Sequence, residues 1–193
     1  MSLATRKRVA VLISGRGSNL RALLDARQDD YEITLVISNR PDAGGLEIAR
    51  AAGVEALIID HKVYGKDREA FERAMDAALR ERNIEIVALA GFMRVLTPFF
   101  VRAWEGRLIN IHPSLLPKYP GVDTHARALA AGDSIHGCTV HLVTEEVDSG
   151  EILGQARLAT LPGDTPETLA ARVLELEHAL YSPCLARLAL SLR

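Results

Sequence analysis

The sequence predicts an α/β protein built on a doubly wound, mainly parallel sheet. Short β-branched or apolar runs alternate with longer stretches of helical periodicity, which is typical of βαβ units. The apolar runs are continuous, as expected of parallel strands that are buried on both faces. A length of 193 residues fits one domain. We therefore expect a single domain over residues 1–193, completed by a C-terminal β-hairpin and a terminal helix.

Five apolar runs are the expected parallel strands: residues 8–14, 33–38, 56–60, 84–90 and 108–111. The clearest helix between them covers residues 67–82, and its apolar positions share one face. These positions are Phe71, Met75, Ala78 and Leu79. The charged positions fall largely on the other faces, and they are Glu69, Glu72, Arg73, Asp76 and Arg80.

The pattern changes after Gly132. Residues 136–144 and 151–160 have the character of two longer strands on either side of a turn at 145–150, which predicts a hairpin. The last helix is expected to begin at residues 164–167, Asp-Thr-Pro-Glu, because they offer an N-cap candidate and a proline in the first turn. It should run to near the C-terminus.

Composition excludes several classes of protein. The chain has 23 Lys and Arg against 25 Asp and Glu, a net charge of −2, so it has no general field for nucleic acid or an anionic membrane. Its two cysteines, Cys138 and Cys184, form no disulfide framework and are expected to be buried as apolar side chains. The apolar run after the N-terminal basic residues is too short for a signal peptide, and no stretch approaches the roughly 18 residues of a membrane span. We expect a cytoplasmic protein.

A glycine-containing loop at residues 14–20, Ser-Gly-Arg-Gly-Ser-Asn-Leu, follows the first strand and opens a helix. Free backbone N–H groups and the partial positive charge of the helix N-terminus favour an anion there, and phosphate is the obvious one. NAD is disfavoured, since Leu20 stands where a third small residue is needed and residues 38–40, Ser-Asn-Arg, hold no acid. The loop also lacks a P-loop lysine. An ordinary tight βα turn remains the alternative.

Asn110 and His112 end the fifth strand and point the same way, because alternate residues of a strand share a face. An amide and an imidazole at this edge can donate to an oxyanion that develops on a carbonyl carbon, and the imidazole can also move a proton. The alternative is a histidine satisfied within its loop. Asp148 lies in the expected hairpin turn, where it either serves as a turn residue or folds over His112 and raises the pKa of the imidazole.

Other constellations fit less well. His136 and Cys138 face one way on their strand and His141 the other, and no zinc-ligand spacing is present, so we expect no metal. The sequence also lacks the Gly-x-Ser-x-Gly elbow of an α/β-hydrolase.

Three segments together match one family. They are Gly-Arg-Gly-Ser-Asn-Leu at 15–20, Ala-Gly-Phe-Met-Arg-Val-Leu at 90–96, and Asn-Ile-His-Pro-Ser-Leu-Leu-Pro-Lys-Tyr-Pro-Gly at 110–121, with Val-Asp-Ser-Gly at 147–150 behind them. Over residues 8–182 the sequence resembles the phosphoribosylglycinamide formyltransferase family, folate-dependent enzymes of purine biosynthesis. The resemblance implies a Rossmann-like formyltransferase fold, with a phosphate-binding half over about 8–100 and a folate-binding and catalytic half over about 101–193.

The resemblance also implies an activity: transfer of a formyl group from 10-formyltetrahydrofolate to the amine of glycinamide ribonucleotide, with no metal. The residues implied at the ribonucleotide phosphate are Gly17, Ser18, Asn19, Leu20, Arg21 and Glu177. Those implied at the folate are Arg68, Met93, Arg94, Val95, Leu96 and Asn110. The implied catalytic residues are Asn110, His112 and Asp148. For Glu177 the alternative is a solvent-facing position on the terminal helix.

The implied chemistry is attack of the amine on the formyl carbon. Asn110 and a protonated His112 would donate to the oxyanion, Asp148 would keep His112 charged, and an ordered water would relay the amine proton to the folate nitrogen. Three alternatives stay open. A methionyl-tRNA formyltransferase would need a longer, basic chain, a formyltetrahydrofolate deformylase would have no need of the phosphate loop, and a binding protein would hold the ligands without transfer. A homodimer also stays open.

Overall fold

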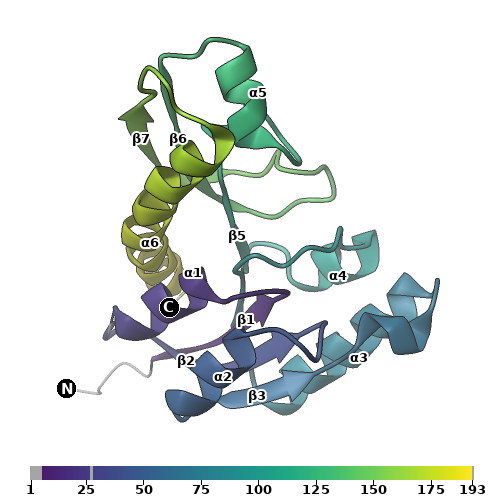
Figure 1. Ribbon diagram of the computed structural model, residues 1–193. Helices are drawn as coiled ribbons and strands as arrows, with labels where there is room; N and C mark the ends of the chain where they lie inside the picture. The colour runs from purple at the N-terminus through teal and green to yellow at the C-terminus, as the bar shows by residue number, and fades with distance from the viewer. Residues whose placement is uncertain (1–5, 27, 193) are drawn as a thin grey trace.

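A computed structural model describes residues 6–26 and 28–192, so residues 1–5, Arg27 and Arg193 of the expected domain lie outside the described residues. Seven strands form a sheet in the order β3-β2-β1-β4-β5-β6-β7 (Figure 1). The strands are β1 (Lys7–Ile13), β2 (Tyr31–Ser38), β3 (Glu55–Ile58), β4 (Ile86–Leu89), β5 (Leu108–His112), β6 (Ile135–Leu142) and β7 (Ile152–Ala159). Strands β1 to β5 pair in parallel, and the β6–β7 hairpin adds antiparallel to β5. The predicted fold class is confirmed, with each strand end within two residues of its expected place.

Helices cover both faces of the sheet. The helices are α1 (Ser18–Asp25), α2 (Gly45–Ala51), α3 (Arg68–Glu81), α4 (Pro98–Ala103), α5 (Thr124–Ala130) and α6 (Pro166–Ser191), with a 3₁₀ turn η1 at His61–Tyr64. In β1, Val9 and Val11 pack with α1, α2 and α6, whereas Ala10 and Leu12 pack with α3 and α4. Both faces of the central strands are therefore buried, which explains their continuous apolar sequence.

Helix α3 matches the expected helix at residues 67–82. Asp67 caps its N-terminus by accepting a hydrogen bond from the backbone N–H of Ala70 at 2.9 Å. The expectation that Glu72 lies on an outer face is wrong, because this side chain is buried against the start of α4. Its carboxylate accepts hydrogen bonds from the backbone N–H of Thr97, at 2.8 Å, and from the Thr97 hydroxyl. Hydrogen bonds from the N-terminus of α4 thus satisfy the Glu72 carboxylate, which the helical pattern alone would place in solvent.

Helix α6 runs along one face of the sheet and brings the end of the chain back to α1 (Figure 1). The hydroxyl of its buried Tyr181 donates to the carbonyl oxygen of Leu89 at 2.8 Å, at the carboxyl end of β4, and to that of Ile109 at 3.2 Å, near the start of β5. Cys138 and Cys184 are free and buried, as expected. Among the described residues, the helices are too short or too polar to span a membrane.

Candidate active site

The loop between β1 and α1 has the form expected of an anion site. Gly17 stands just before α1 with φ 82°, a left-handed conformation that favours glycine. A Cβ at this position would also lie 2.6 Å from the Cα of Gly45, so the loop packs directly against α2. The first backbone hydrogen bond of α1 runs from Arg21 N to Gly17 O at 2.9 Å, which leaves the N–H groups of residues 18–20 for a ligand.

A cavity of about 520 Å³ opens at this loop. It is lined by Ser14, Gly15, Arg16, Gly17, Ser18, Asn19, Asn39, Arg40, His61, Ala90, Gly91, Met93 and Arg94. Of the residues that the resemblance assigns to the phosphate, Leu20 has a fully buried side chain and can offer only its backbone, and Arg21 already uses its backbone N–H. Neither of them lines the cavity.

Glu177 reaches this loop from α6. It is buried, and its Oε2 accepts a hydrogen bond from Asn19 Nδ2 at 2.7 Å. Burial raises the pKa of the Glu177 carboxyl, although the Asn19 hydrogen bond opposes the shift. Within the part of the chain that the structure describes, Asn19 Oδ1 is buried without a hydrogen-bond partner. The solvent-facing alternative for Glu177 is therefore wrong, and an unused acceptor lies beside the loop.

A second cavity, of about 710 Å³, adjoins the first through Gly91, Met93 and Arg94. Met93, Arg94, Val95 and Leu96 line it together with Asn110, His112, His141 and Asp148. Besides the hydrogen bonds of Thr97 to Glu72, two contacts hold the loop at 91–97. Its Met93 N–H donates to Ser14 Oγ at 2.8 Å, and the guanidinium of Arg68, the first residue of α3, donates to the carbonyl of Val95.

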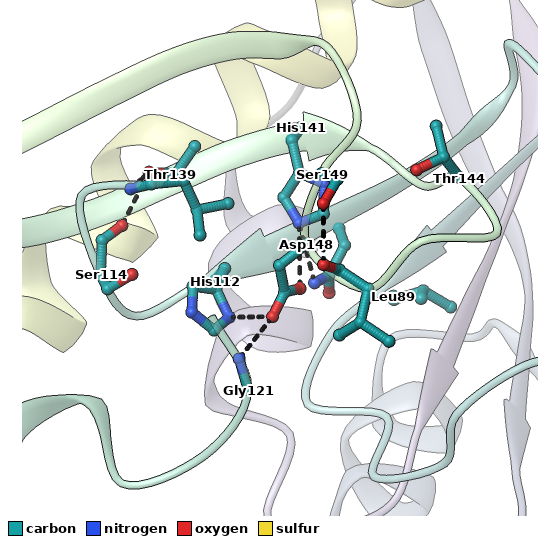
Figure 2. A network of polar contacts seen from close by, with 12 residues as sticks. Leu89, His112, Ser114, Gly121, Thr139, His141, Thr144, Asp148 and Ser149 are labelled. Carbon is teal, nitrogen blue, oxygen red and sulfur yellow. Dashed lines mark hydrogen bonds and ion pairs between the residues drawn. The ribbon is translucent and has the colours of Figure 1, made fainter. Parts of the chain in front are cut away.

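The residues expected to be catalytic meet at the floor of this second cavity. Asn110 and His112 lie on β5, and the pairing of β5 with β6 places His141 opposite Asn110. Asp148, with φ 53°, folds back from the β6–β7 turn (Figure 2). Its Oδ2 lies 3.4 Å from His112 Nδ1 and accepts from the Gly121 N–H at 2.8 Å, and its Oδ1 lies 3.6 Å from His141 Nε2. The turn therefore closes over His112.

Burial and charge oppose each other at His112. Its side chain is 6% exposed, and burial lowers its pKa below the ordinary value more than the Tyr119 hydrogen bond and the Asp148 charge raise it. His112 Nε2 donates to the Tyr119 carbonyl at 2.8 Å. The Asp148 charge therefore acts in the expected direction, towards a protonated His112, and desolvation opposes it.

Asp148 itself is held ionised. Burial alone would raise the pKa of its carboxyl, but the neighbouring His141 and His112 rings and the hydrogen bond from the Gly121 N–H together lower it. A fixed negative charge thus faces two imidazole rings in a site that is largely closed to water.

Sequence reasoning missed His141, Ser14 and Asn39 as site residues. The sequence places His141 on the opposite face from His136, and the structure agrees: His136 Nε2 lies 3.1 Å from His125 Nδ1 on α5, whereas His141 contacts Asp148. Ser14 Oγ donates to Asn39 Oδ1 at 2.6 Å and accepts a hydrogen bond from the backbone N–H of Met93, a residue expected at the folate. The register between strands, which brings His141 to Asn110, has no local sequence signal.

Among the described residues, no group of three or more His, Cys, Asp or Glu side chains could hold a metal ion.

Comparison with known proteins gives consistent matches. A family model described as formyl transferase matches residues 7–185. The phosphoribosylglycinamide formyltransferase of Escherichia coli (strain K12) is 46% identical over 176 residues, which cover 90% of this chain and 82% of that protein. The trifunctional purine biosynthetic protein adenosine-3 of Drosophila pseudoobscura pseudoobscura is 51% identical over 95% of this chain, but the chain spans 14% of that protein's length.

A solved structure gives the same answer for the fold. Glycinamide ribonucleotide transformylase 1 from Symbiobacterium toebii superimposes with a TM-score of 0.94 at 41% identity, over 99% of this chain and 94% of that one. The family model covers far more than half of the residues, and the E. coli relative is matched over most of its own length. The chain therefore belongs to the formyl transferase family.

Proposed function

We propose that the chain transfers the formyl group of 10-formyltetrahydrofolate to the amine of glycinamide ribonucleotide, a step of purine biosynthesis in the cytoplasm. The observation that carries the proposal is the position of Asn110, His112 and Asp148 in a cavity that adjoins an anion-binding loop. Two substrates held in adjoining cavities can react without leaving the protein. The names of the E. coli and S. toebii relatives support the same choice of acceptor.

The first cavity would hold the ribonucleotide. Its phosphate would accept hydrogen bonds from the N–H groups of Ser18, Asn19 and Leu20, where the dipole of α1 favours negative charge. Arg21 would act through its exposed side chain, and Glu177 through its hydrogen bond to Asn19. The proposed phosphate-binding and folate-binding halves are therefore not separate in space, because α6 of the second half reaches the loop between β1 and α1.

The second cavity would hold the folate. The loop Met93 to Leu96 would bind the pterin largely through backbone groups, and Arg68 fixes that loop while its charge suits a carboxylate of the folate tail. The exposed side chains of Met93 and Val95 offer apolar surface for the ligand at the rim of the cavity.

In the reaction, the amine nitrogen bonds to the formyl carbon, whose oxygen becomes an oxyanion. Asn110 Nδ2 and His112 Nε2 would donate to it, and His112 must first exchange its Tyr119 partner for the substrate oxygen. The developing anion then favours a proton on His112, and the resulting imidazolium lies beside Asp148. When the bond from the formyl carbon to the folate nitrogen breaks, a water relays the amine proton to that nitrogen. The scheme uses no metal.

The test follows tetrahydrofolate release from 10-formyltetrahydrofolate, with and without glycinamide ribonucleotide. We expect release only when the ribonucleotide is present, and we expect His112→Ala to slow it by about 10² to 10³ because an oxyanion donor is lost. Equal release without the ribonucleotide would establish a deformylase. Folate binding without release would establish a binding protein, and near-full turnover by a folded His112→Ala variant would remove His112 from the mechanism.

A further inference from the structure

We propose that His141 is a positioning residue that fixes the orientation of the Asn110 side-chain amide, so that an N–H group and not the carbonyl faces the reacting oxygen. The inference rests on the proposed formyl transfer. It concerns a residue outside the expected catalytic trio of Asn110, His112 and Asp148.

The backbone settles which nitrogen of the His141 ring carries the hydrogen. Nδ1 lies 2.8 Å from the carbonyl oxygen of Leu142, and a carbonyl only accepts, so Nδ1 must donate. In the neutral ring, Nε2 is then left with a free lone pair. Only 2% of the side chain is exposed, so water has little access to compete for this lone pair.

The partner of that lone pair is Asn110. His141 Nε2 lies 3.3 Å from Asn110 Nδ2, an arrangement in which the amide donates and the ring accepts. Turning the amide over would place its Oδ1 against the lone pair of Nε2, which is repulsive. The contact therefore selects one of the two amide orientations.

The selected orientation matters because Asn110 lines the second cavity. The amide nitrogen Nδ2 of Asn110 carries two hydrogens, and one of them is used by His141. The second remains available to a developing oxyanion, where a preorganised donor is most effective. With the amide turned over, the carbonyl oxygen would face that negative charge instead.

The surrounding sheet holds His141 in place. His141 pairs with Asn110 across β5 and β6, so the two side chains extend from neighbouring strands. On its other side, the pairing of β6 with β7 shifts register between Val140 and His141. Irregularities of this kind redirect a side chain from a strand. The shift therefore helps to set the direction of the His141 side chain.

A role through Asp148 is the competing explanation, since Asp148 Oδ1 lies 3.6 Å from the same Nε2. The two roles differ in their dependence on Asn110. A residue that acts through Asn110 has no further effect once Asn110 is removed, whereas one that acts through Asp148 does.

The kinetic test compares His141→Leu, His141→Gln, Asn110→Ala and the double variant His141→Leu with Asn110→Ala. We expect His141→Leu to lower kcat by about tenfold to a hundredfold with both KM values nearly unchanged, as for a misplaced catalytic group. His141→Gln should recover most of this loss, because its side-chain oxygen can accept the same N–H. In the Asn110→Ala background, His141→Leu should cost little more. Losses that multiply in the double variant would overturn the inference.

A second measurement needs neither a variant nor turnover. The ¹⁵N resonances of the wild-type His141 ring should show hydrogen on Nδ1 and none on Nε2, with a coupling through the hydrogen bond to Asn110 Nδ2. Hydrogen on Nε2, in a neutral or in a charged ring, would overturn the inference whatever the activity. A third outcome is that the His141 ring has the expected hydrogens but the protein shows no formyl transfer. That outcome would refute the proposed function and leave the Asn110–His141 hydrogen bond established.

Discussion

At His112, burial and the charge of Asp148 act in opposite directions on the pKa of one side chain. Burial lowers the pKa of the His112 imidazole, and Asp148 opposes this from 3.4 Å. A substrate oxyanion beside the ring would add a second negative charge and favour the protonated form. In the proposed reaction, the pKa of His112 would therefore rise as negative charge develops on the substrate.

The contribution of Asp148 can be measured on the free protein. Asp148→Asn removes the negative charge beside His112, so the pKa of His112 should fall further, because the charged form loses its attractive partner. Proton-detected titration of the His112 ring checks this. Glu146→Gln, an exposed residue of the same turn, is the matched control and should leave the titration unchanged. An unchanged His112 pKa in Asp148→Asn would contradict the electrostatic role.

At the scale of elements, the loop from β1 into α1 depends on Gly17. Gly17→Ala places a side chain at φ 82° and within 2.6 Å of the Gly45 Cα, so both strain and overlap oppose it. We expect a loss of about 2 to 4 kcal/mol in the free energy of unfolding. Gly15→Ala in the same loop meets nothing within 4 Å and should cost little. Denaturant unfolding of the two variants checks the prediction, and equal stability would argue against the packed loop.

The contact between α5 and β6 should make the fold sensitive to acid. Burial, with smaller contributions from the His136 and His112 charges, lowers the pKa of His125 to about 4. Between about pH 6.5, the ordinary value, and pH 4, His125 therefore binds a proton in the unfolded chain but not in the folded chain. Stability is fully present above that value and is lost as the pH falls towards 4. Since the ring is only half-buried, solvent screening reduces the expected loss to about 1 to 2 kcal/mol.

Unfolding measured between pH 7 and pH 4 checks the His125 prediction. His125→Gln should flatten the dependence over this interval, because the variant has no group to protonate at that position. An undiminished slope in the variant would assign the acid sensitivity to other groups.

Much of this level of structure could be predicted from the sequence. The alternation of apolar strands and helical stretches indicated the order of elements, and the glycine loop and the proline at the start of α6 marked where two helices begin. Glu72 was misplaced because helical periodicity carries no information about the neighbouring helix. The N–H of Thr97 that satisfies it comes from α4, 25 residues further along the chain.

At the scale of the whole molecule, α6 connects the C-terminal part of the chain to the loop between β1 and α1 through Glu177. Glu177→Ala removes the acceptor for Asn19 Nδ2, so the loop loses a fixed side chain. We expect the KM for the ribonucleotide to rise about tenfold, which corresponds to roughly 1.4 kcal/mol of binding, with the KM for folate unchanged. Glu175→Ala, exposed on the same helix, is the control. A rise in the folate KM alone would contradict this role.

The candidate site was predictable only in part. Asn110 and His112 share a face by simple alternation along β5, and the glycine loop indicates its own use. For Asp148 the local sequence left two roles open, a turn residue or a partner of His112, because its approach to His112 depends on how the β6–β7 hairpin folds back. The role of His141 depends on strand register. The net shift of the His112 pKa depends on burial, which no local pattern measures.

The most direct test of this account is a structure of the chain with glycinamide ribonucleotide and a folate whose formyl group cannot be transferred. We expect the phosphate at the N–H groups of residues 18–20 and the pterin along residues 93–96, with the amine about 3 to 3.5 Å from the formyl carbon. The formyl oxygen should lie within hydrogen-bond distance of Asn110 Nδ2 and His112 Nε2, with the Tyr119 carbonyl released. A formyl group bound away from these atoms, or a phosphate bound elsewhere, would contradict the account.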